Sequence, residues 1–344
     1  MTKAVAADMD WNNLGFKYWD LPYRYQAVYK DGKWQKGGLV EDSNLTLSEA
    51  AEDFHYGQEV FEGLKAYRCK DGSVNLFRPE MNAKRMQDSA KRLCMATYPI
   101  DDFVAAVKEV VKANQEFIPP YGTGGSLYLR PFMIGTEPMV GVKPSKTYVF
   151  RVFATPVGAY IKGLTPMPYF VSEFDRAAYA GTGQAKTAGN YAGSLYPAMQ
   201  AKSNGFADCL YLDPRDHKYI DEFGGANFYG ITKDGQFVTP KSDSILPSVT
   251  KKSLLEIAGD LGMNPTETQI KMEDFDQFTE AGAMGTAAVI SPVGSLTYKD
   301  QKFVPFSETE TETGPATKKL YDELTGIQMS ERPDKRGWVQ KVEL

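Results

Sequence analysis

The amino-acid sequence predicts a two-domain protein of the α+β class. Its 344 residues exceed the usual length of one domain, and 42% hydrophobic residues provide enough apolar material for packed cores. Short runs of β-branched and aromatic residues flank Asp-Gly, which readily accepts the positive φ of a two-residue hairpin turn, so antiparallel strands are expected. Helical patterns lie between these hairpins in a mixed order, which favours separate layers of sheet and helix over a regular βαβ winding.

Three hairpins are expected along the chain. The runs that would form their strands are residues 25–29 with 33–34, 64–68 with 74–77, and 228–232 with 236–238. The turns between the runs carry Asp31-Gly32, Asp71-Gly72 and Asp234-Gly235. Each hairpin should therefore contribute an antiparallel unit to a sheet.

Three helices are also expected, each after a residue that suits a helix start. The first follows Pro79, and its apolar face is formed by Met86, Ala90, Leu93 and Cys94. The second follows Asp101, and its apolar face is formed by Phe103, Val107, Val110, Val111 and Phe117. The third follows Ser248 and presents Leu254, Ala258 and Leu261 on one side.

The domain boundary is expected near the middle of the chain. The segment from Val157 to Pro168 contains several glycine and proline residues and no sustained period, which is typical of a connection. We therefore expect a smaller N-terminal α+β domain at 1–158, a connection at 159–170 and a larger C-terminal domain at 171–344. The polar, acidic segment 306–314 is expected to be a solvated loop.

Composition argues against several classes of protein. The 39 Lys and Arg against 44 Asp and Glu give a net charge of −5, which disfavours nucleic-acid binding by release of phosphate counterions. No segment approaches the ~20 apolar residues that cross a bilayer, and the first residues lack a signal-peptide pattern. Cys69, Cys94 and Cys209 are too scattered for a disulfide framework or a thiolate metal site, so we expect a cytoplasmic protein without a metal. With only two histidines, catalysis must depend on other groups.

The segment from Ala180 to Tyr191, AGTGQAKTAGNY, contains a lysine within a run of small residues. It fails as a phosphate-binding P-loop, because alanine stands where two glycines are needed and no buried strand precedes it. Lys186 could be an ordinary solvated lysine. Its small neighbours would, however, let a planar ligand approach closely, and a desolvated amine is the usual Schiff-base nucleophile, so Lys186 is a candidate catalytic residue.

Further along the chain, three features have both a functional and an ordinary interpretation. Glu222 ends an expected strand before two glycines and could be an exposed strand-end carboxylate, just as Asn227 could be a turn residue. Residues 248–250 start the third helix and offer free amides and a hydroxyl to a phosphate, although N-capping by Ser248 explains the same residues. Gly282–Thr286 is a second candidate anion loop, or only the entry to a strand.

In this order, the features resemble the branched-chain amino-acid aminotransferases, which are class IV enzymes of pyridoxal-phosphate fold type IV. The class signature is matched without a break in spacing by Glu222-x-Gly224-x2-Asn227-Phe228-Tyr229, Phe237-x-Thr239 and Leu246-x-Ser248-Val249-x-Lys251. Residues 55–68, 77–93 and 127–135 are similar to the N-terminal domain of these enzymes, so the resemblance covers nearly the whole chain. It implies the two-domain α+β fold of a transaminase whose C-terminal domain binds pyridoxal 5'-phosphate.

The resemblance implies a role for each matching residue toward this cofactor. Lys186 would be the Schiff-base lysine, Tyr191 would hydrogen-bond the phenolic oxygen, and Glu222 would pair with the pyridine nitrogen and keep the ring an electron sink. The phosphate would be held by Arg85, the amides of Val249 and Thr250, and the side chain of Thr286.

Substrate contacts are implied in the same way. The α-carboxylate would be held by Tyr128 and the amides of Thr286 and Ala287. Tyr56 and Arg130 would reach the distal carboxylate of glutamate, and Phe61 would line the pocket for an apolar side chain. A homodimer is also implied, in which loops of one subunit close the partner's site.

The predicted activity is transamination between L-leucine, L-isoleucine or L-valine and 2-oxoglutarate, giving branched-chain 2-oxo acids and L-glutamate. Within the same fold, a D-amino-acid transaminase and an aminodeoxychorismate lyase are the alternatives, and residues 10–41 and 128–130 favour the branched-chain enzyme. Two alternatives come from other classes. A P-loop phosphotransferase would bind nucleotide and carry no chromophore, and a cofactor-free interaction protein would neither bind nucleotide nor carry a chromophore. Some animal members of the family carry a CxxC redox pair where this chain has Ala288 and Ser291, so no thiol switch is expected there.

Overall fold

The computed structural model of the chain describes residues 3–158, 164–306 and 310–344. Its internal contacts divide the chain into two compact units. Unit 1 comprises Met1–Tyr160, Ala185–Ala188 and Gly326–Leu344, and unit 2 comprises Ile161–Gln184 and Gly189–Thr325. Two segments that the expected boundaries assign to the C-terminal domain, 185–188 and 326–344, thus belong to unit 1.

The sheet of unit 1 is antiparallel. Within the described residues its strands follow the order β18-β6-β5-β7-β8-β1-β2, with β3 paired to β1 and β4 paired to β7. The strands are β1 (Arg24–Lys30), β2 (Lys33–Trp34), β3 (Gly38–Val40), β4 (Glu59–Phe61), β5 (Leu64–Arg68), β6 (Val74–Phe77), β7 (Ser126–Gly135), β8 (Tyr148–Val157) and β18 (Val339–Val342). The C-terminal strand β18 pairs with β6, from Val339 opposite Phe77 to Val342 opposite Val74, and this pairing attaches the end of the chain to unit 1.

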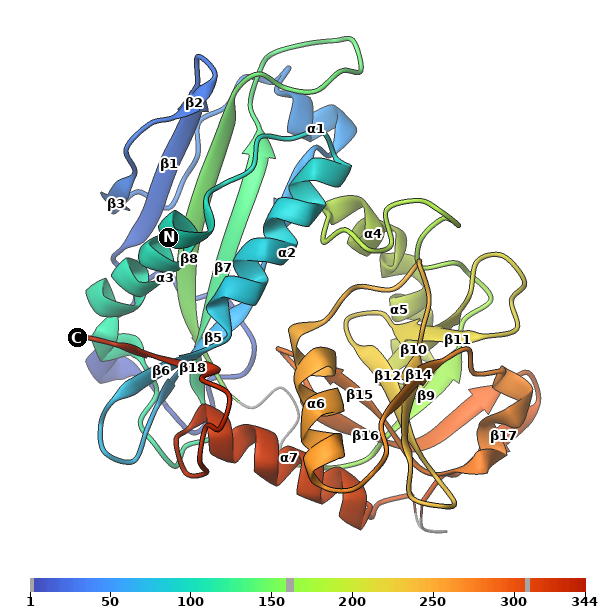
Figure 1. The fold of residues 1–344 in the computed structure, drawn as a ribbon. Helices are drawn as coiled ribbons and strands as arrows, with labels where there is room; N and C mark the ends of the chain where they lie inside the picture. Colours follow the sequence, from blue (N-terminus) through green and yellow to red (C-terminus); the bar gives the residue numbers. More distant parts are fainter. Residues whose placement is uncertain (1–2, 159–163, 307–309) are drawn as a thin grey trace. The chain divides into compact units, whose positions relative to one another are not determined.

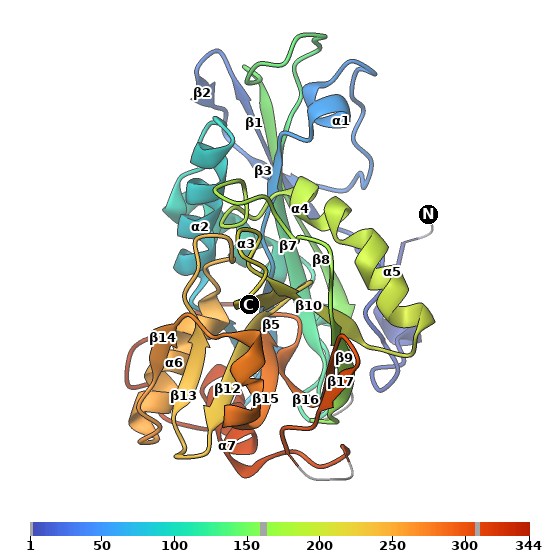
Figure 2. The ribbon, with the colours of Figure 1, turned by 90° about the vertical axis from the view of Figure 1, so that its right-hand side faces the viewer.

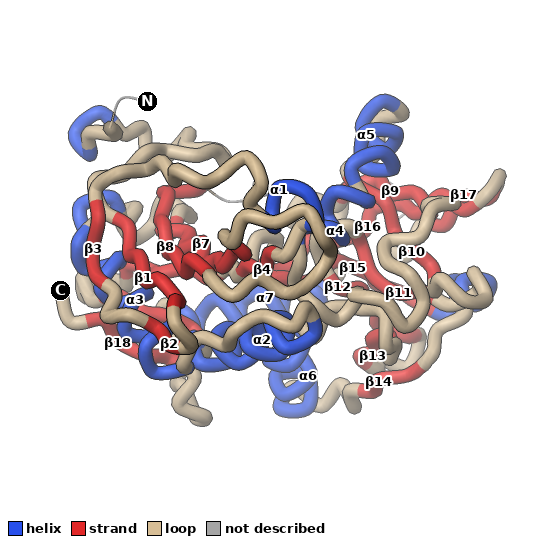
Figure 3. The backbone as a smooth tube through the Cα atoms, turned by 90° about the horizontal axis from the view of Figure 1, so that it is seen from above, coloured by secondary structure: helices blue, strands red, loops and turns tan. Residues whose placement is uncertain are grey.

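Helices α2 (Pro79–Arg92) and α3 (Ile100–Ala113) cover one face of this sheet (Figure 1), and seen from above both lie on the same side of the strands (Figure 3). Their buried side chains, among them Met86 and Phe103, share one hydrophobic core with the strands. Burial of these apolar surfaces holds the helices on the sheet. The shorter elements of unit 1 are α1 (Glu52–Tyr56) and the 3-10 turns η1 (Ala6–Asp8) and η2 (Gln115–Phe117).

The sheet of unit 2 closes on itself. In the described part of the chain its strands follow the order β11-β10-β9-β16-β15-β12-β13-β14, β17 pairs with β16, and an additional pairing of β11 with β12 closes a ring. The strands are β9 (Met167–Val171), β10 (Asp208–Leu212), β11 (Ile220–Phe223), β12 (Asn227–Thr232), β13 (Phe237–Pro240), β14 (Thr266–Thr268), β15 (Phe278–Gly285), β16 (Val289–Tyr298) and β17 (Gln301–Phe303). Strand β9 is parallel to both β10 and β16, whereas β15 is antiparallel to both β12 and β16.

The core of unit 2 contains aromatic side chains such as Phe223, Phe228 and Phe275. Figure 2 shows β12, β13 and β15 of this unit side by side, with α6 beside them. The helical elements that begin in this half of the sequence are α4 (Ala188–Gly193), α5 (Leu195–Ser203), α6 (Val249–Asp260), η3 (Met272–Gln277) and α7 (Pro315–Gln328).

The three expected hairpins are confirmed as the antiparallel pairs β1–β2, β5–β6 and β12–β13. Asp31 and Gly32 have φ of 54° and 77°, the pair of positive values that a type I′ turn requires. The expected helices correspond to α2, α3 and α6. Phe117, however, lies in η2 and not on the second helix, because α3 ends at Ala113.

Part of the expected connection at 159–170 forms a strand. Residues 159–163 lie outside the described residues, and Met167–Val171 forms β9, a strand with a partner on each side. Residues 307–309 of the expected acidic loop also lie outside the described residues. Among the helices of the described chain, none combines the length and the apolarity needed to cross a bilayer.

Candidate active site

The backbone around Lys186 is held beside β4. Phe61 N donates a hydrogen bond to Lys186 O at 3.0 Å, and Thr187 forms a bridge with Val60. Lys186 N donates to Ser89 Oγ of α2 at 2.9 Å. The four residues 185–188 are therefore fixed by both a strand and a helix of unit 1, which explains how a run of small residues holds a lysine in one place.

The amine of Lys186 lies in an environment that favours its neutral form. Lys186 Nζ is 4.7 Å from the centroid of the Phe61 ring. Burial, followed by the nearby Arg85 cation, lowers the pKa of Lys186 to about 8, while Glu62 opposes the shift. A lysine with a pKa this low has a much larger fraction of nucleophilic free amine near neutral pH than a solvated lysine.

Arg85 of α2 forms a two-point ion pair with a buried carboxylate. Its Nε lies 2.7 Å from Glu62 Oε1, and its Nη2 donates to Glu62 Oε2 at 2.7 Å. Glu62 is fully buried and also accepts from Asn82 Nδ2 at 2.8 Å. This fork fixes the plane of the guanidinium, whereas binding of a phosphate by Arg85 remains a prediction.

Tyr128 and Arg130 stand two residues apart on β7 and therefore share a face of the sheet. Arg130 Nη2 donates to Tyr128 Oη at 3.0 Å, and the guanidinium lies 4.8 Å from the Phe61 ring centroid. Among the described residues, Arg130 Nε is a buried donor without a hydrogen-bond partner. The structure thus brings Arg130, Tyr128, Phe61 and Lys186 together around one aromatic ring.

Tyr56 is not part of this cluster by its recorded contacts. It lies at the end of α1, is 38% exposed, and donates from its hydroxyl to Val140 O. Its expected role toward a distal carboxylate remains a prediction.

In unit 2, Glu222 is buried on β11 with donors to both of its oxygens. Oε1 lies 2.7 Å from Arg176 Nε and accepts from Leu246 N at 3.0 Å. Oε2 accepts from Asn227 Nδ2 at 2.8 Å, and Asn227 stands opposite Glu222 in the β11–β12 pair. With 3% exposure, Glu222 is not the exposed strand-end residue of the ordinary interpretation, and Asn227 is a strand residue rather than a turn residue.

The start of α6 agrees with both interpretations of its sequence. Ser248 is the N-cap, because its side chain accepts from Lys251 N at 3.2 Å. Within the described residues, no acceptor is recorded for the backbone amides of Val249 and Thr250, the first two residues of the helix. Two amides at the positive end of a twelve-residue helix suit an anion.

The second candidate anion loop requires a correction. Gly282 to Gly285 belong to β15, where they pair with β16, so they form a strand and not a loop. Of that expected loop, Thr286 lies in the turn between the two strands, where Ala287 follows it, and both residues are half-buried. Tyr191 is a half-buried residue of α4.

Comparison with known proteins assigns the family. A family model described as "Amino-transferase class IV" matches residues 59–296, more than half of the chain.

The chain belongs to the class IV aminotransferases.

Two curated relatives carry a narrower name. The branched-chain-amino-acid aminotransferase of Haemophilus influenzae is 55% identical over 98% of this chain and 99% of its own length. That of Helicobacter pylori is 46% identical over 97% of this chain and 98% of its own length. At these levels of identity, this class IV aminotransferase belongs with the branched-chain group.

Solved structures support the same fold. A crystal structure of the Escherichia coli branched-chain amino acid aminotransferase has a TM-score of 0.77 at 28% identity and covers 92% of this chain and 99% of that chain. The T.th. branched-chain amino acid aminotransferase, solved with pyridoxamine 5'-phosphate, has a TM-score of 0.77 at 26% identity and covers 92% of this chain and 98% of that chain. The predicted fold class, a two-domain α+β fold type IV transaminase, is confirmed.

Sequence reasoning missed two partners in this aminotransferase. Arg176 and Glu62 each form a buried ion pair with a predicted site residue, Glu222 and Arg85 respectively. The sequence offered a signal for Glu62, which is a charged residue within an apolar run, between Phe61 and Leu64. Arg176 carries no comparable local signal.

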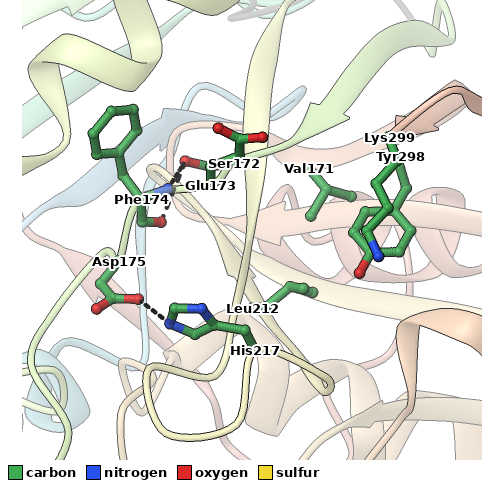
Figure 4. Close-up of a pocket in the computed structure, with 9 residues that line it drawn as sticks. All are labelled: Val171, Ser172, Glu173, Phe174, Asp175, Leu212, His217, Tyr298 and Lys299. Atoms are coloured by element: carbon green, nitrogen blue, oxygen red, sulfur yellow. Dashed lines mark hydrogen bonds and ion pairs between the residues drawn. The ribbon is translucent and has the colours of Figure 1, made fainter.

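A separate cavity of about 300 Å³ lies in unit 2 of the aminotransferase, where the parallel strands β9, β10 and β16 end (Figure 4). Its lining includes the ion pair of His217 Nε2 with Asp175 Oδ1 at 2.9 Å, and these side chains are 58% and 44% exposed. None of the predicted site residues lines this cavity.

Proposed function

We propose that this class IV aminotransferase transfers an amino group between L-leucine, L-isoleucine or L-valine and 2-oxoglutarate, with pyridoxal 5'-phosphate as its cofactor. The single observation that carries the proposal is the Lys186 amine, whose pKa is lowered to about 8 beside Phe61 and near Arg85 and Arg130. The names of the Haemophilus and Helicobacter relatives support the branched-chain substrates.

The residues present fit a phosphorylated pyridine aldehyde. A lysine amine with a lowered pKa suits an aldehyde, and a buried carboxylate suits a protonated ring nitrogen. The two amides at the start of α6, with no acceptor recorded for them in the described chain, suit a phosphate. We assign the aldehyde to Lys186, the ring nitrogen to Glu222 and the phenolic oxygen to Tyr191. The phosphate is assigned to the amides of Val249 and Thr250 together with Arg85 and Thr286.

Bound pyridoxal phosphate supplies an electron-withdrawing ring that takes up the charge left on the substrate α-carbon when its proton is removed. Lys186 Nζ would take up the proton released by the substrate and give it back, since an amine with a pKa near 8 exchanges protons readily near neutral pH. Glu222 would hold the ring nitrogen and favour its charged form.

One site must accept both an apolar side chain and the side chain of glutamate. Phe61 provides an apolar wall, and Arg130 beside it provides a cation with a buried, unpartnered Nε. A buried carboxylate is costly unless a cation pairs with it. We therefore assign the distal carboxylate to Arg130 with Tyr56, and the α-carboxylate to Tyr128 with the amides of Thr286 and Ala287.

The proposal is tested by assaying the purified protein, loaded with pyridoxal phosphate, with 2-oxoglutarate and each candidate amino donor. L-Leucine, L-isoleucine and L-valine should give L-glutamate. D-Alanine should give none, and aminodeoxychorismate should release no pyruvate. Turnover of either compound in place of leucine would transfer the assignment to another member of the same fold. The homodimer and the cytoplasmic location expected from the sequence remain predictions.

A further inference from the structure

Arg176 lies in the segment that follows β9, and its contacts with Glu222, Gly183 and Ser244 lie in unit 2. Its Nε lies 2.7 Å from Glu222 Oε1, and its side chain is 9% exposed. Its Nη2 donates to Gly183 O at 2.9 Å and also to Ser244 O. One guanidinium therefore joins a carboxylate to the backbone of two other segments.

Both of these backbone segments lead to residues of the proposed site. Gly183 is three residues before Lys186 in the chain, and Ser244 is two residues before Leu246, whose amide also donates to Glu222. The two segments touch: a Cβ on Gly183 would lie 2.0 Å from Ser244 O, so only glycine fits there. Arg176 gives a donor to the carbonyl of each residue at this contact, and buried carbonyls require such donors.

The positive charge of Arg176 stabilises the ionised form of Glu222, beyond what a hydrogen bond from a neutral donor would do. Glu222 is 3% exposed, and two of its donors, Asn227 Nδ2 and Leu246 N, are neutral, whereas Arg176 carries a charge. A buried carboxylate without a cation takes up a proton to avoid its own desolvation cost. Paired with Arg176, Glu222 can remain ionised and leave the proton on a ring nitrogen.

Other titratable groups near Arg176 do not replace this pairing. Asp221, the neighbour of Glu222 on β11, accepts from Ser244 Oγ at 2.6 Å, and burial raises its pKa. Burial likewise raises the pKa of Tyr211 on β10, so this phenol stays neutral. Arg176 acts electrostatically on both groups, and it forms an ion pair with Glu222.

We propose that Arg176 is a positioning residue that keeps Glu222 ionised toward the cofactor's pyridine nitrogen and fixes the Gly183 and Ser244 segments that lead to the lysine and the phosphate cradle. This inference rests on the proposed function. It makes the protonation of the bound cofactor depend on a residue that acts through Glu222.

The test compares Arg176→Met with Arg24→Met, a matched control in unit 1. The side chain of Arg24 is 3% exposed, against 9% for Arg176; it pairs with Asp20 Oδ1 at 2.6 Å and donates to the carbonyls of Leu21 and Glu41. Both variants lose one arginine with one carboxylate and two carbonyl contacts. A general loss of stability should therefore appear in both, as a lower unfolding midpoint of the apo-protein.

Two readouts separate positioning from stability. We expect Arg176→Met to weaken binding of pyridoxal phosphate to the apo-protein by about tenfold or more, measured by titration. We also expect the acid-side change in the absorbance of the bound cofactor to move up by about one pH unit or more, because an unpaired Glu222 takes up a proton at higher pH. Arg24→Met should leave the affinity within about twofold of wild type and the absorbance profile unchanged.

The Glu222→Gln background shows whether the effect passes through this carboxylate. There, Arg176→Met should no longer shift the absorbance profile. An unshifted profile for Arg176→Met in the wild-type background, or the same shift in both backgrounds, would overturn the proposal. If Arg176→Met does not fold, Arg176→Lys is the deciding variant, since it keeps the positive charge but loses the several donors of the guanidinium. Its absorbance profile should stay near wild type while its affinity for pyridoxal phosphate falls. A wild-type affinity would contradict the proposal. Failure of the wild-type protein to bind the cofactor or convert leucine would instead refute the proposed function.

Discussion

In each unit of the described chain, a predicted site residue belongs to an arginine–carboxylate pair, and the two pairs have different geometries. In unit 1, Arg85 meets Glu62 through two contacts of 2.7 Å, so the carboxylate holds the arginine. In unit 2, Arg176 meets a single oxygen of Glu222 at 2.7 Å, while Asn227 binds the other oxygen. The difference suggests opposite roles: Glu62 orients an arginine for an anion, and Arg176 orients a carboxylate for a cation.

Arg130 differs from these two arginines because it has no carboxylate partner in the described part of the chain. In the described part of the chain no carboxylate forms an ion pair with it, its Nη2 donates to Tyr128 Oη, and its Nε is buried and unpartnered. Two arginines are thus paired within the protein, and the third retains donor capacity for a carboxylate that arrives with the substrate.

The largest effect should come from removing the amine of Lys186. Lys186→Ala should lower turnover with L-leucine by about 10²–10⁴-fold or more, because the variant has no amine to move the proton. The fold should be retained, since Ala180, Ala185 and Ala188 show that this run accommodates small residues. Steady-state turnover and circular dichroism measure the two outcomes, and turnover near the wild-type rate would refute the central assignment.

Arg130→Leu tests whether the unpaired arginine serves the distal carboxylate. Only glutamate would then bury an uncompensated charge, so its reaction should be impaired more than that of leucine, by roughly 2–4 kcal/mol in transition-state terms. The two half-reactions should be measured separately in single turnover, as rate over apparent affinity. Equal losses for both substrates would assign Arg130 to the framework of the site or to the α-carboxylate.

Glu62→Gln and Glu222→Gln test the opposite roles of the two carboxylates. Glu222→Gln should slow the proton-transfer step by about tenfold or more, which corresponds to a rise of about 1.4 kcal/mol in the activation free energy for each tenfold. The change in cofactor affinity should be smaller. Glu62→Gln should do the reverse, because Arg85 loses the charge that orients it and the phosphate contact weakens. Single-turnover rates with leucine and cofactor titrations give both quantities. If both variants change the same quantity, the two pairs have the same role.

How much of this could be read from the sequence depends on the range of the interactions. Asp31-Gly32 and Ser248 specify a turn and a helix start through local chemistry, and both were predicted. The membership of residues 326–344 in unit 1 depends on pairing of β18 with β6, which lies more than 250 residues earlier, and no local pattern encodes it. Arg176 was missed for the same reason, because its partner Glu222 is 46 positions away, whereas Lys186 was found because its unusual neighbours adjoin it in the chain.

The smallest expected effect concerns the charge balance around the lysine. Burial and then Arg85 lower the pKa of Lys186 to about 8, from the 10.5 of a free lysine. In the apo-protein the reactivity of this amine toward an acylating reagent should therefore rise with a midpoint near pH 8, measured by mass spectrometry of the modified peptide.

Arg85→Met should move that midpoint to higher pH, because removing a nearby cation makes the charged form of Lys186 less costly while Glu62 continues to favour it. The shift should be less than the whole difference from 10.5, since burial is the larger cause and is retained. Arg24→Met, which removes a buried cation from the same unit but not one of those acting on Lys186, should leave the midpoint unchanged. A midpoint that falls in Arg85→Met would mean that loss of the arginine buries the amine further, and the electrostatic account of unit 1 would then be wrong.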